Sequence, residues 1–469
     1  MRRRLWVGIG IGLLGLAACS QADARREMAG EAASFLERRP APTGQVVEVR
    51  LTAAPTRLEL LDGRMLDVWA YNGSVPGPTI RAREGDTIRV HFKNELPQPT
   101  TVHWHGIRLP NGMDGVPGVT QPAVQPGEGF VYEFLARDPG TFWFHPHVRG
   151  SEQLGRGLYG VLIIEEAEPP PVREILWVLD DWRLDESGQI DPRFVTRSDL
   201  AHDGRWGSVI TVNGVQAPQI ELAAGERVRL RILNAANGRV FRPDLSGLDA
   251  KVIAFDGLAT KRPLPAEGVE LAPGNRVDLD LLAPPRPGAS IPVIDRFTRR
   301  PNHLATLRIG EAKENVAASK PIELRGFVPA WRRAEAIEPE LEFRLNAARG
   351  GPYGLQWMIN GEVMHHDADQ PMSEWQEPPY ALRAGRWAKL RFTNESARLH
   401  PMHLHGQFFK VVARDGRPVD EEHWRDTVLV RSRETVDVAL VPTELGNWML
   451  HCHIMEHQDA GMMTLVAVE

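Results

Sequence analysis

Histidine and cysteine side chains gather in a few short stretches of this 469-residue sequence. The densest stretch, residues 450–462, holds a thiol, three imidazoles and two thioethers. Copper prefers such nitrogen and sulfur ligands. The chain contains two cysteines, Cys19 and Cys452. Cys452 therefore points to a copper–thiolate centre; the alternative is a buried cysteine with histidines nearby by chance, because free cysteine is often a small core residue.

Four His-X-His pairs occur, two near each end of the chain. On a β-strand, residues i and i+2 project from the same face, so each pair can reach one metal ion or two adjacent ones. Eight imidazoles are enough for a three-metal cluster held between the first and last parts of the chain. The eight residues are His103, His105, His145, His147, His403, His405, His451 and His453.

A second set of ligands lies in the same C-terminal region. His400, Cys452 and His457 would form a trigonal site, and Met462 follows at a spacing that suits a weak axial thioether. This is the ligand set of a blue-copper electron-transfer centre. Because Cys452 lies between His451 and His453, its thiolate would be joined to the cluster by a few covalent bonds.

Three similar strand patterns position these ligands. They begin at Gly85, Gly225 and Gly385, carry apolar residues three, five and seven positions later, and end on an asparagine nine positions later. This period is typical of a half-buried strand. Three copies in phase, each preceded by Asn-Gly, predict three homologous domains of short strands, which fit Greek-key β-sandwiches.

The predicted organisation has five parts. Residues 1–18 form an export signal, 19–44 a tether, 45–168 a first domain with cluster ligands, 172–312 a second domain without copper ligands, and 320–469 a third domain with both sets.

The N-terminus predicts export, because three arginines precede an apolar run. Leu16 to Cys19 resembles a lipoprotein processing box, which favours a periplasmic protein anchored through lipidated Cys19; cleavage after Ala24 is the alternative. The arginines also weakly resemble a twin-arginine signal. The net charge of −6 without a basic stripe excludes nucleic acid as a partner.

The four His-X-His motifs, in this order, resemble those of the multicopper oxidases, specifically the three-domain bacterial laccase and copper-oxidase branch. The resemblance extends from about Val46 to Glu469. The resemblance implies cupredoxin-like domains and four coppers. It also implies one-electron oxidation of four substrate equivalents, electron transfer through Cys452, His451 and His453, and reduction of O₂ to water. The implied ligands are His400, Cys452, His457 and Met462 for type-1 copper; His103 and His403 for type 2; and His105, His145, His147, His405, His451 and His453 for type 3.

The resemblance also implies an acid beside the cluster, since O₂ reduction consumes protons. Asp114 occupies that position; the alternative is that Asp114 serves only as a turn residue. Where the family commonly has a second acid, this chain has Gln458, so the proton relay must use water, Asp459 or Glu456. The second domain is expected to act as a spacer that also helps shape the substrate surface.

Two kinds of donor remain open. A laccase-like enzyme would oxidise phenols or aromatic amines at an open edge near His457, whereas a copper-tolerance enzyme would oxidise Cu(I). The chain has twelve methionines without a Met-rich run, and Arg398 stands where cuprous oxidases tend to have a soft ligand. Residues 364–372 could bind a substrate metal ion or form a polar loop. A non-enzymatic copper protein is a minor alternative, and we expect a monomer.

Overall fold

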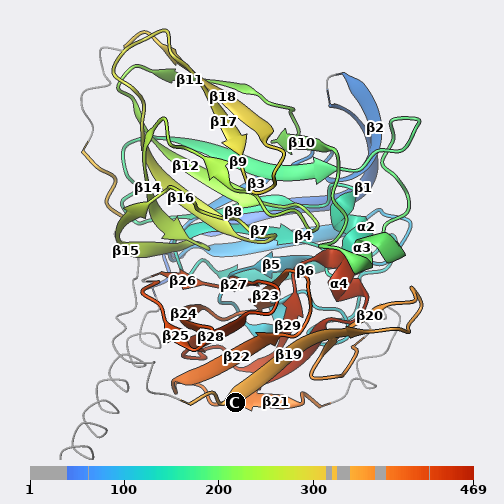
Figure 1. Cartoon of the computed structure of the whole chain (residues 1–469). Coiled ribbons are helices and arrows are strands. Elements are labelled where there is room, and N and C mark those ends of the chain that lie inside the picture. Colours follow the sequence, from blue (N-terminus) through green and yellow to red (C-terminus); the bar gives the residue numbers. More distant parts are fainter. Residues whose placement is uncertain (1–39, 62, 313–319, 325–337, 365–376, 422) are drawn as a thin grey trace, which may run out of the picture.

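The computed structural model describes residues 40–61, 63–312, 320–324, 338–364, 377–421 and 423–469. In these residues the chain forms six β-sheets in three consecutive pairs (Figure 1). The predicted all-β fold of consecutive cupredoxin-like sandwiches is confirmed. Across the same residues no helix is both long and apolar enough to span a membrane. The predicted signal, most of the tether and Cys19 lie outside the described residues.

Each sandwich is built from short strands with few helical turns. The first joins sheets β2-β1-β4-β6 and β3-β8-β7-β5. Its elements are β1 (Val46–Leu60), β2 (Arg64–Tyr71), β3 (Thr79–Arg83), β4 (Thr87–Asn94), β5 (His103–His105), the 3-10 turn η1 (Asn111–Met113), β6 (Gly129–Leu135), β7 (Gly140–His145), α2 (Gly150–Gly155) and β8 (Gly160–Glu165).

The second sandwich joins sheets β10-β9-β12-β16-β14-β15 and β11-β18-β17-β13. Its elements are β9 (Arg173–Trp182), α3 (Arg197–Ala201), β10 (Val209–Val212), β11 (Gln219–Ala223), β12 (Arg227–Asn234), β13 (Pro243–Asp244), β14 (Asp249–Phe255), β15 (Leu258–Pro265), β16 (Arg276–Leu282), β17 (Ser290–Asp295) and β18 (Asn302–Gly310).

The third sandwich joins sheets β20-β19-β22-β28-β24-β25, with β26 beside β24, and β21-β30-β29-β23-β27. Its elements are β19 (Leu341–Ala348), β20 (Gln356–Ile359), β21 (Tyr380–Leu382), β22 (Ala388–Asn394), β23 (His400–Leu404), β24 (Phe409–Arg414), β25 (Arg417–Pro418), β26 (Trp424–Arg425), β27 (Thr427–Val430), β28 (Thr435–Leu440), β29 (Gly446–Cys452), α4 (Met455–Asp459) and β30 (Met463–Val468).

The threefold sequence repeat is also a threefold structural repeat. Strands β4, β12 and β22 each pair in parallel with one neighbour, β1, β9 or β19, and antiparallel with the other, β6, β16 or β28. The asparagine that ends each strand makes the same bonds: its side-chain oxygen accepts from the amide two residues on, and its amide donates to nearby carbonyls. These residues are Asn94, Asn234 and Asn394. Each asparagine therefore fixes the loop that leaves its strand.

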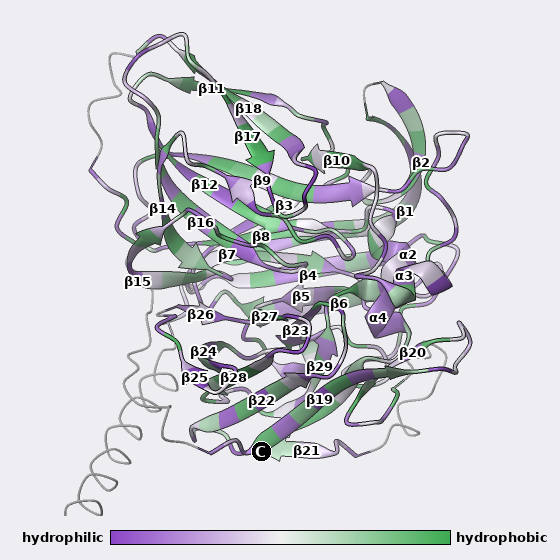
Figure 2. Ribbon diagram, viewed as in Figure 1, coloured by the Kyte–Doolittle hydropathy of each residue, from purple (hydrophilic) through white to green (hydrophobic). Residues whose placement is uncertain are grey.

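The core keeps the first and third sandwiches together. One hydrophobic cluster includes Trp104 of the first and Trp448 of the third, whereas most of the second sandwich has a core of its own. The strands alternate between hydrophobic and hydrophilic residues, as Figure 2 shows. The histidine-bearing strands β5, β7, β23 and β29 consequently meet where two sandwiches share one core.

Candidate metal centre

His400, Cys452 and His457 converge in the third sandwich. Strands β23 and β29 pair antiparallel, with Met402 opposite Cys452, so His400 and Cys452 lie near each other, and α4 brings His457 back toward them. Cys452 Sγ lies 3.7 Å from His400 Nδ1 and 3.8 Å from His457 Nδ1, and the two nitrogens are 3.3 Å apart. All three side chains are fully buried.

This triangle fits a metal ion. A triangle with these sides has its centre about 2.1 Å from each corner, close to the lengths of first-row metal–nitrogen and metal–thiolate bonds. The outer ring nitrogens are already engaged: His457 Nε2 pairs with the His202 carbonyl at 2.9 Å, and His400 Nε2 with Ser396 Oγ at 2.9 Å. The Nδ1 atoms are therefore left to face the centre.

Burial sets the protonation states of these groups. It lowers the pKa of His457 to about 3 and that of His400 well below its ordinary value, so both rings are neutral and can ligate. It also raises the pKa of the Cys452 thiol, so a metal ion is needed to stabilise a thiolate there.

Met462 lies in the turn after α4, in direct backbone contact with this triangle. Its N–H donates to the His457 carbonyl at 3.0 Å, and the Cys452 N–H donates to the Met462 carbonyl at 3.0 Å. The side chain is fully buried in the same hydrophobic cluster as Cys452. The turn after α4 therefore brings Met462 next to two of the three ligands, and its axial role stays a prediction.

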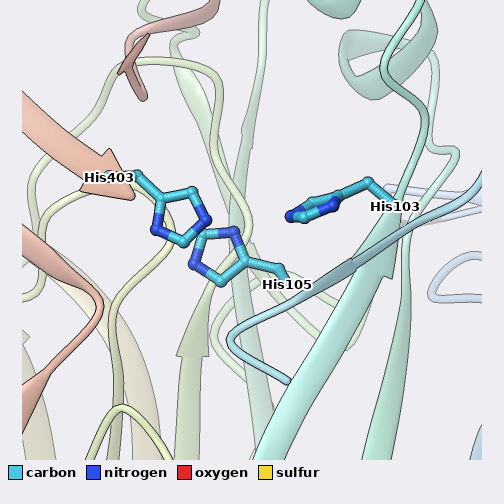
Figure 3. A group of neighbouring side chains, drawn as sticks. All are labelled: His103, His105 and His403. Carbon is cyan, nitrogen blue, oxygen red and sulfur yellow. The ribbon is translucent and has the colours of Figure 1, made fainter. Parts of the chain in front are cut away.

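All eight histidines of the His-X-His pairs come together between the first and third sandwiches. Their ring nitrogens fall into close groups, and every ring is buried. Figure 3 shows the His105 and His403 rings against each other, stacked at 3.7 Å between centroids, and the His103 ring facing this pair, with its centroid 5.8 Å from that of His105 and 6.0 Å from that of His403. The groups are His105, His145 and His453; His147, His405 and His451; and His103, His105 and His403.

The hydrogen bonds of these rings decide which nitrogen faces the cluster. His103 Nδ1 pairs with the Asp114 carbonyl at 2.8 Å, and His403 Nδ1 with the Asp426 carbonyl at 2.8 Å. Their Nε2 atoms are buried and have no hydrogen-bond partner among the described residues. In His105 the two ring nitrogens have the opposite roles. Its Nε2 pairs with Asp426 Oδ1 at 3.0 Å, and its Nδ1 has no hydrogen-bond partner among the described residues. Buried, unpartnered nitrogens are the donor set that a metal cluster requires.

Asp114 lies where the sequence predicted an acid. Its Oδ2 accepts from His405 Nδ1 at 2.8 Å, and its carbonyl holds His103. Since it is 1% exposed, it is an internal contact of the cluster as well as a turn residue.

Sequence reasoning missed Asp426. Besides contacting His105 and His403, this fully buried carboxylate forms an ion pair with Arg276 of the second sandwich at 2.7 Å. Although burial opposes ionisation, Arg276 and His403 lower the pKa of Asp426 to about 2. No motif in the sequence marks Asp426, which follows Trp424 and Arg425 in an unremarkable strand pattern; only the pairing of β23 with β27 brings it to His403.

The acids near Gln458 bind the other sandwiches. Asp459 accepts the backbone N–H groups of Gly150 and Ser151 at 3.1 and 2.9 Å. Glu456 accepts from Asn237 Nδ2 and from the Arg205 N–H, both at 3.0 Å, and burial raises its pKa to about 7. Gln458 is 2% exposed, and its Oε1 has no hydrogen-bond partner within the described part of the chain.

Comparison with known proteins assigns this arrangement to a family. Family models described as multicopper oxidase match residues 52–169, 174–289 and 350–469. The chain is similar to multicopper oxidase MmcO of Mycobacterium tuberculosis, with 32% identity over 98% of this chain and 95% of the relative. It is also similar to the multicopper oxidase structures of Pseudomonas thermotolerans (37% identity, 90% and 99% coverage, TM-score 0.80) and Pseudomonas parafulva (38%, 90% and 100%, TM-score 0.79). The chain therefore belongs to the multicopper oxidases, enzymes with one type-1, one type-2 and two type-3 coppers that oxidise a reducing substrate with O₂.

Proposed function

We propose that this multicopper oxidase is laccase-like and takes electrons from phenols or aromatic amines. Bound copper would accept these electrons one at a time and pass four of them to O₂. The ligands we propose are those inferred above: His400, Cys452, His457 and Met462 at type 1, His103 and His403 at type 2, and the remaining six histidines at type 3.

The observation that carries this proposal is a cavity against the type-1 ligands, which we call the Trp357 cavity. Its volume is about 290 Å³, and its lining is Leu200, Ala201, Asn346, Ala347, Leu355, Trp357, Glu395, Ser396, Ala397 and Arg398. Organic ligands favour such mostly apolar pockets with a few polar groups. Among the residues that the structure describes, the lining has no thiol, thioether or imidazole, the groups that would select Cu(I).

Trp357 connects this cavity with the type-1 ligands. Its ring centroid lies 4.3 Å from that of His457 and 4.8 Å from that of His400, and its Nε1 donates to the Leu200 carbonyl at 3.1 Å. Ser396, which also lines the cavity, holds His400 Nε2. A ring in the cavity would thus approach the metal through Trp357 and His400.

The sequence predicts an open edge near His457, but the His457 ring itself is covered. This ring is fully buried, and its outer nitrogen is covered by the His202 carbonyl. Electron entry therefore has to run through packed side chains rather than by direct contact of a donor with His457.

The chain's own residues supply the remaining functions. The backbone joins Cys452 directly to His451 and His453, so electron transfer between the two sites requires no conformational change. Asp114, in contact with His405, is positioned to deliver a proton to the O₂ site.

Cu(I) oxidation remains the second candidate. Residues 365–376, most of the loop that suggested it, lie outside the described residues. Met364 packs beside Val116, Met449 and Met463 in a small hydrophobic cluster, which favours a structural role for this thioether.

We further propose export to the periplasm with a lipid anchor at Cys19, a monomeric state, and domains at 45–168, 172–312 and 320–469. The N-terminal sequence pattern supports export and the anchor, and the strand repeat supports the domain bounds.

The test compares catalytic efficiency for a phenol and for Cu(I), each with and without added Cu(II), with O₂ uptake as the readout. We expect about four coppers per chain, an intense blue colour and a higher kcat/KM for the phenol. A higher kcat/KM for Cu(I) would replace the proposal with the second candidate. Absence of O₂ uptake with either donor would reject both.

A further inference from the structure

Three residues of the second sandwich reach the copper cluster region from loops next to β14 and β16. Asp256 lies in the turn after β14, Asn275 precedes β16, and Arg276 begins it. All are nearly or fully buried, at 0%, 2% and 0% exposure. They face Asp426 and Thr427 of the third sandwich, so the second domain, expected to act as a spacer that helps shape the substrate surface, also contacts the cluster region.

Arg276 contacts all three sandwiches. Its Nη1 donates to Asp426 Oδ1 at 3.0 Å, and its Nη2 lies 2.7 Å from Asp426 Oδ2. Its Nε donates to the Thr141 carbonyl of β7, the strand that carries His145. Such a planar, permanently charged group can fix a carboxylate in both position and orientation.

Asp256 and Asn275 hold the backbone of the same segment. Asp256 Oδ2 accepts from the N–H groups of Asp426 and Thr427 at 3.2 and 3.4 Å. Asn275 Nδ2 donates to the Thr427 carbonyl at 3.0 Å and also to the Asp256 carboxylate. The Asp256 carboxylate in turn accepts the Arg276 N–H at 2.9 Å. Side chain and backbone of Asp426 are therefore both held by the second sandwich.

The segment held in this way orients two cluster histidines in opposite senses. The Asp426 carbonyl engages His403 Nδ1 and leaves its Nε2 for the cluster, whereas the Asp426 carboxylate engages His105 Nε2 and leaves its Nδ1. One displaced residue would misdirect both rings. The space is tight, because a Cβ on Gly106 would lie 2.4 Å from both Arg276 Nη2 and Asp426 Oδ2.

We propose that Arg276 and Asp256 are positioning residues of the copper cluster, which fix the Asp426–Thr427 segment so that His105 and His403 present the correct nitrogens. This inference rests on the proposed assignment of His403 to type 2 and His105 to type 3. It gives the second domain a part in assembling a site to which it contributes no ligand.

The test uses Arg276→Gln and Asp256→Asn, with Arg229→Gln as the matched control. Arg229 is also buried between sandwiches, at 1% exposure, and pairs with Asp278 and Glu166, so its loss likewise removes a buried cation from a carboxylate network, in which Asp278 keeps its second partner Arg231. The control contacts no cluster histidine in the described structure. Readouts are copper content, the type-2 signal in electron paramagnetic resonance, and the blue type-1 absorption.

We expect Arg276→Gln and Asp256→Asn to lower the affinity for type-2 copper by up to about 10- to 100-fold, the effect of removing a direct partner of a metal ligand such as Asp426, and to shift the type-2 signal. The blue absorption should persist, and Arg229→Gln should match the parent protein. A parental type-2 signal and copper content in both variants would overturn the inference, as would parallel loss of type-1 and type-2 copper in all three variants.

If Arg276→Gln does not fold, Asp256→Asn, which keeps nearly the same shape, decides alone. Failure of the function proposal is distinguishable, because it concerns O₂ uptake by the parent protein with each donor, whereas this test compares copper signals between variants.

Discussion

Replacing Asp114 with asparagine separates its structural contact from its proposed acid role. The carboxylate accepts from His405 Nδ1 at 2.8 Å, and asparagine can still accept there through its Oδ1. The hydrogen bond between His103 Nδ1 and the Asp114 backbone carbonyl is retained, whereas the 3.2 Å contact of His103 Nδ1 with Asp114 Oδ1 loses its charge. In the variant, a neutral hydrogen bond replaces a charge-assisted one. This change lowers the free energy of unfolding by about 1 kcal/mol.

The catalytic effect should be larger. An amide cannot donate a proton as a carboxylic acid does, and a positioned acid typically contributes about 10²–10⁴-fold in rate. We therefore expect Asp114→Asn to slow O₂ reduction by at least about 100-fold, roughly 3 kcal/mol of barrier, while the unfolding free energy falls by about 1 kcal/mol.

The assay separates the two half-reactions. Anaerobic bleaching of the blue absorption by a phenol reports electron entry, and return of the colour on mixing with O₂ reports the cluster reaction. Bleaching should keep its parental rate and recovery should slow. A variant that recovers within about threefold of the parental rate would refute an acid role for Asp114, because general acid catalysis contributes much more than this.

Three further predictions concern acids near the two sites. Gln458→Glu should raise the O₂-reduction rate, since burial beside Asp459 would keep the new carboxyl protonated; unchanged or lower turnover in O₂-uptake assays would contradict this. Glu395→Gln should lower kcat/KM for a phenol, which must lose a proton on oxidation, but not for ferrocyanide, which loses none; equal effects on both donors in steady-state assays would exclude a proton-accepting role. Glu456 has its pKa raised by burial to about 7, so the copper-free protein should lose stability as pH rises from about 4.5 through 7, and denaturant titrations should show a flatter profile for Glu456→Gln.

Glu456 contributes to the stability of the fold while its carboxyl is protonated. The folded protein binds the Glu456 proton more tightly than the unfolded chain does, so its contribution to stability is complete below about 4.5 and is lost above 7. A stability that rises over this window in the parent, relative to Glu456→Gln, would show that the carboxyl is held ionised instead.

The sequence was sufficient where chemistry depended on local spacing. His-X-His spacing on strands predicted which imidazoles share a face, and the repeats at Gly85, Gly225 and Gly385 located β4, β12 and β22. These inferences succeeded because strand period and ligand spacing are properties of neighbouring residues.

Contacts between distant residues could not be predicted in the same way. Arg276 and Asp426 lie 150 positions apart, and nothing in either local sequence indicates that they pair inside the cluster region. Likewise, the closed edge of His457 results from the carbonyl of His202, which only the packing of α3 near α4 brings there. Such contacts depend on how the sandwiches pack against each other rather than on local patterns.

The shared histidine cluster also has a consequence for the lifetime of the folded chain. Cys452 is the only cysteine among the described residues, so no disulfide links distant parts of this region. Coordination of His105 together with His453 would cross-link residues more than 300 positions apart in sequence. In the chain-entropy model a closed loop of this size contributes about 6 kcal/mol by restricting the unfolded state. Bound copper would thus act as a reversible cross-link. In a cell short of copper, the protein would be easier to unfold and degrade.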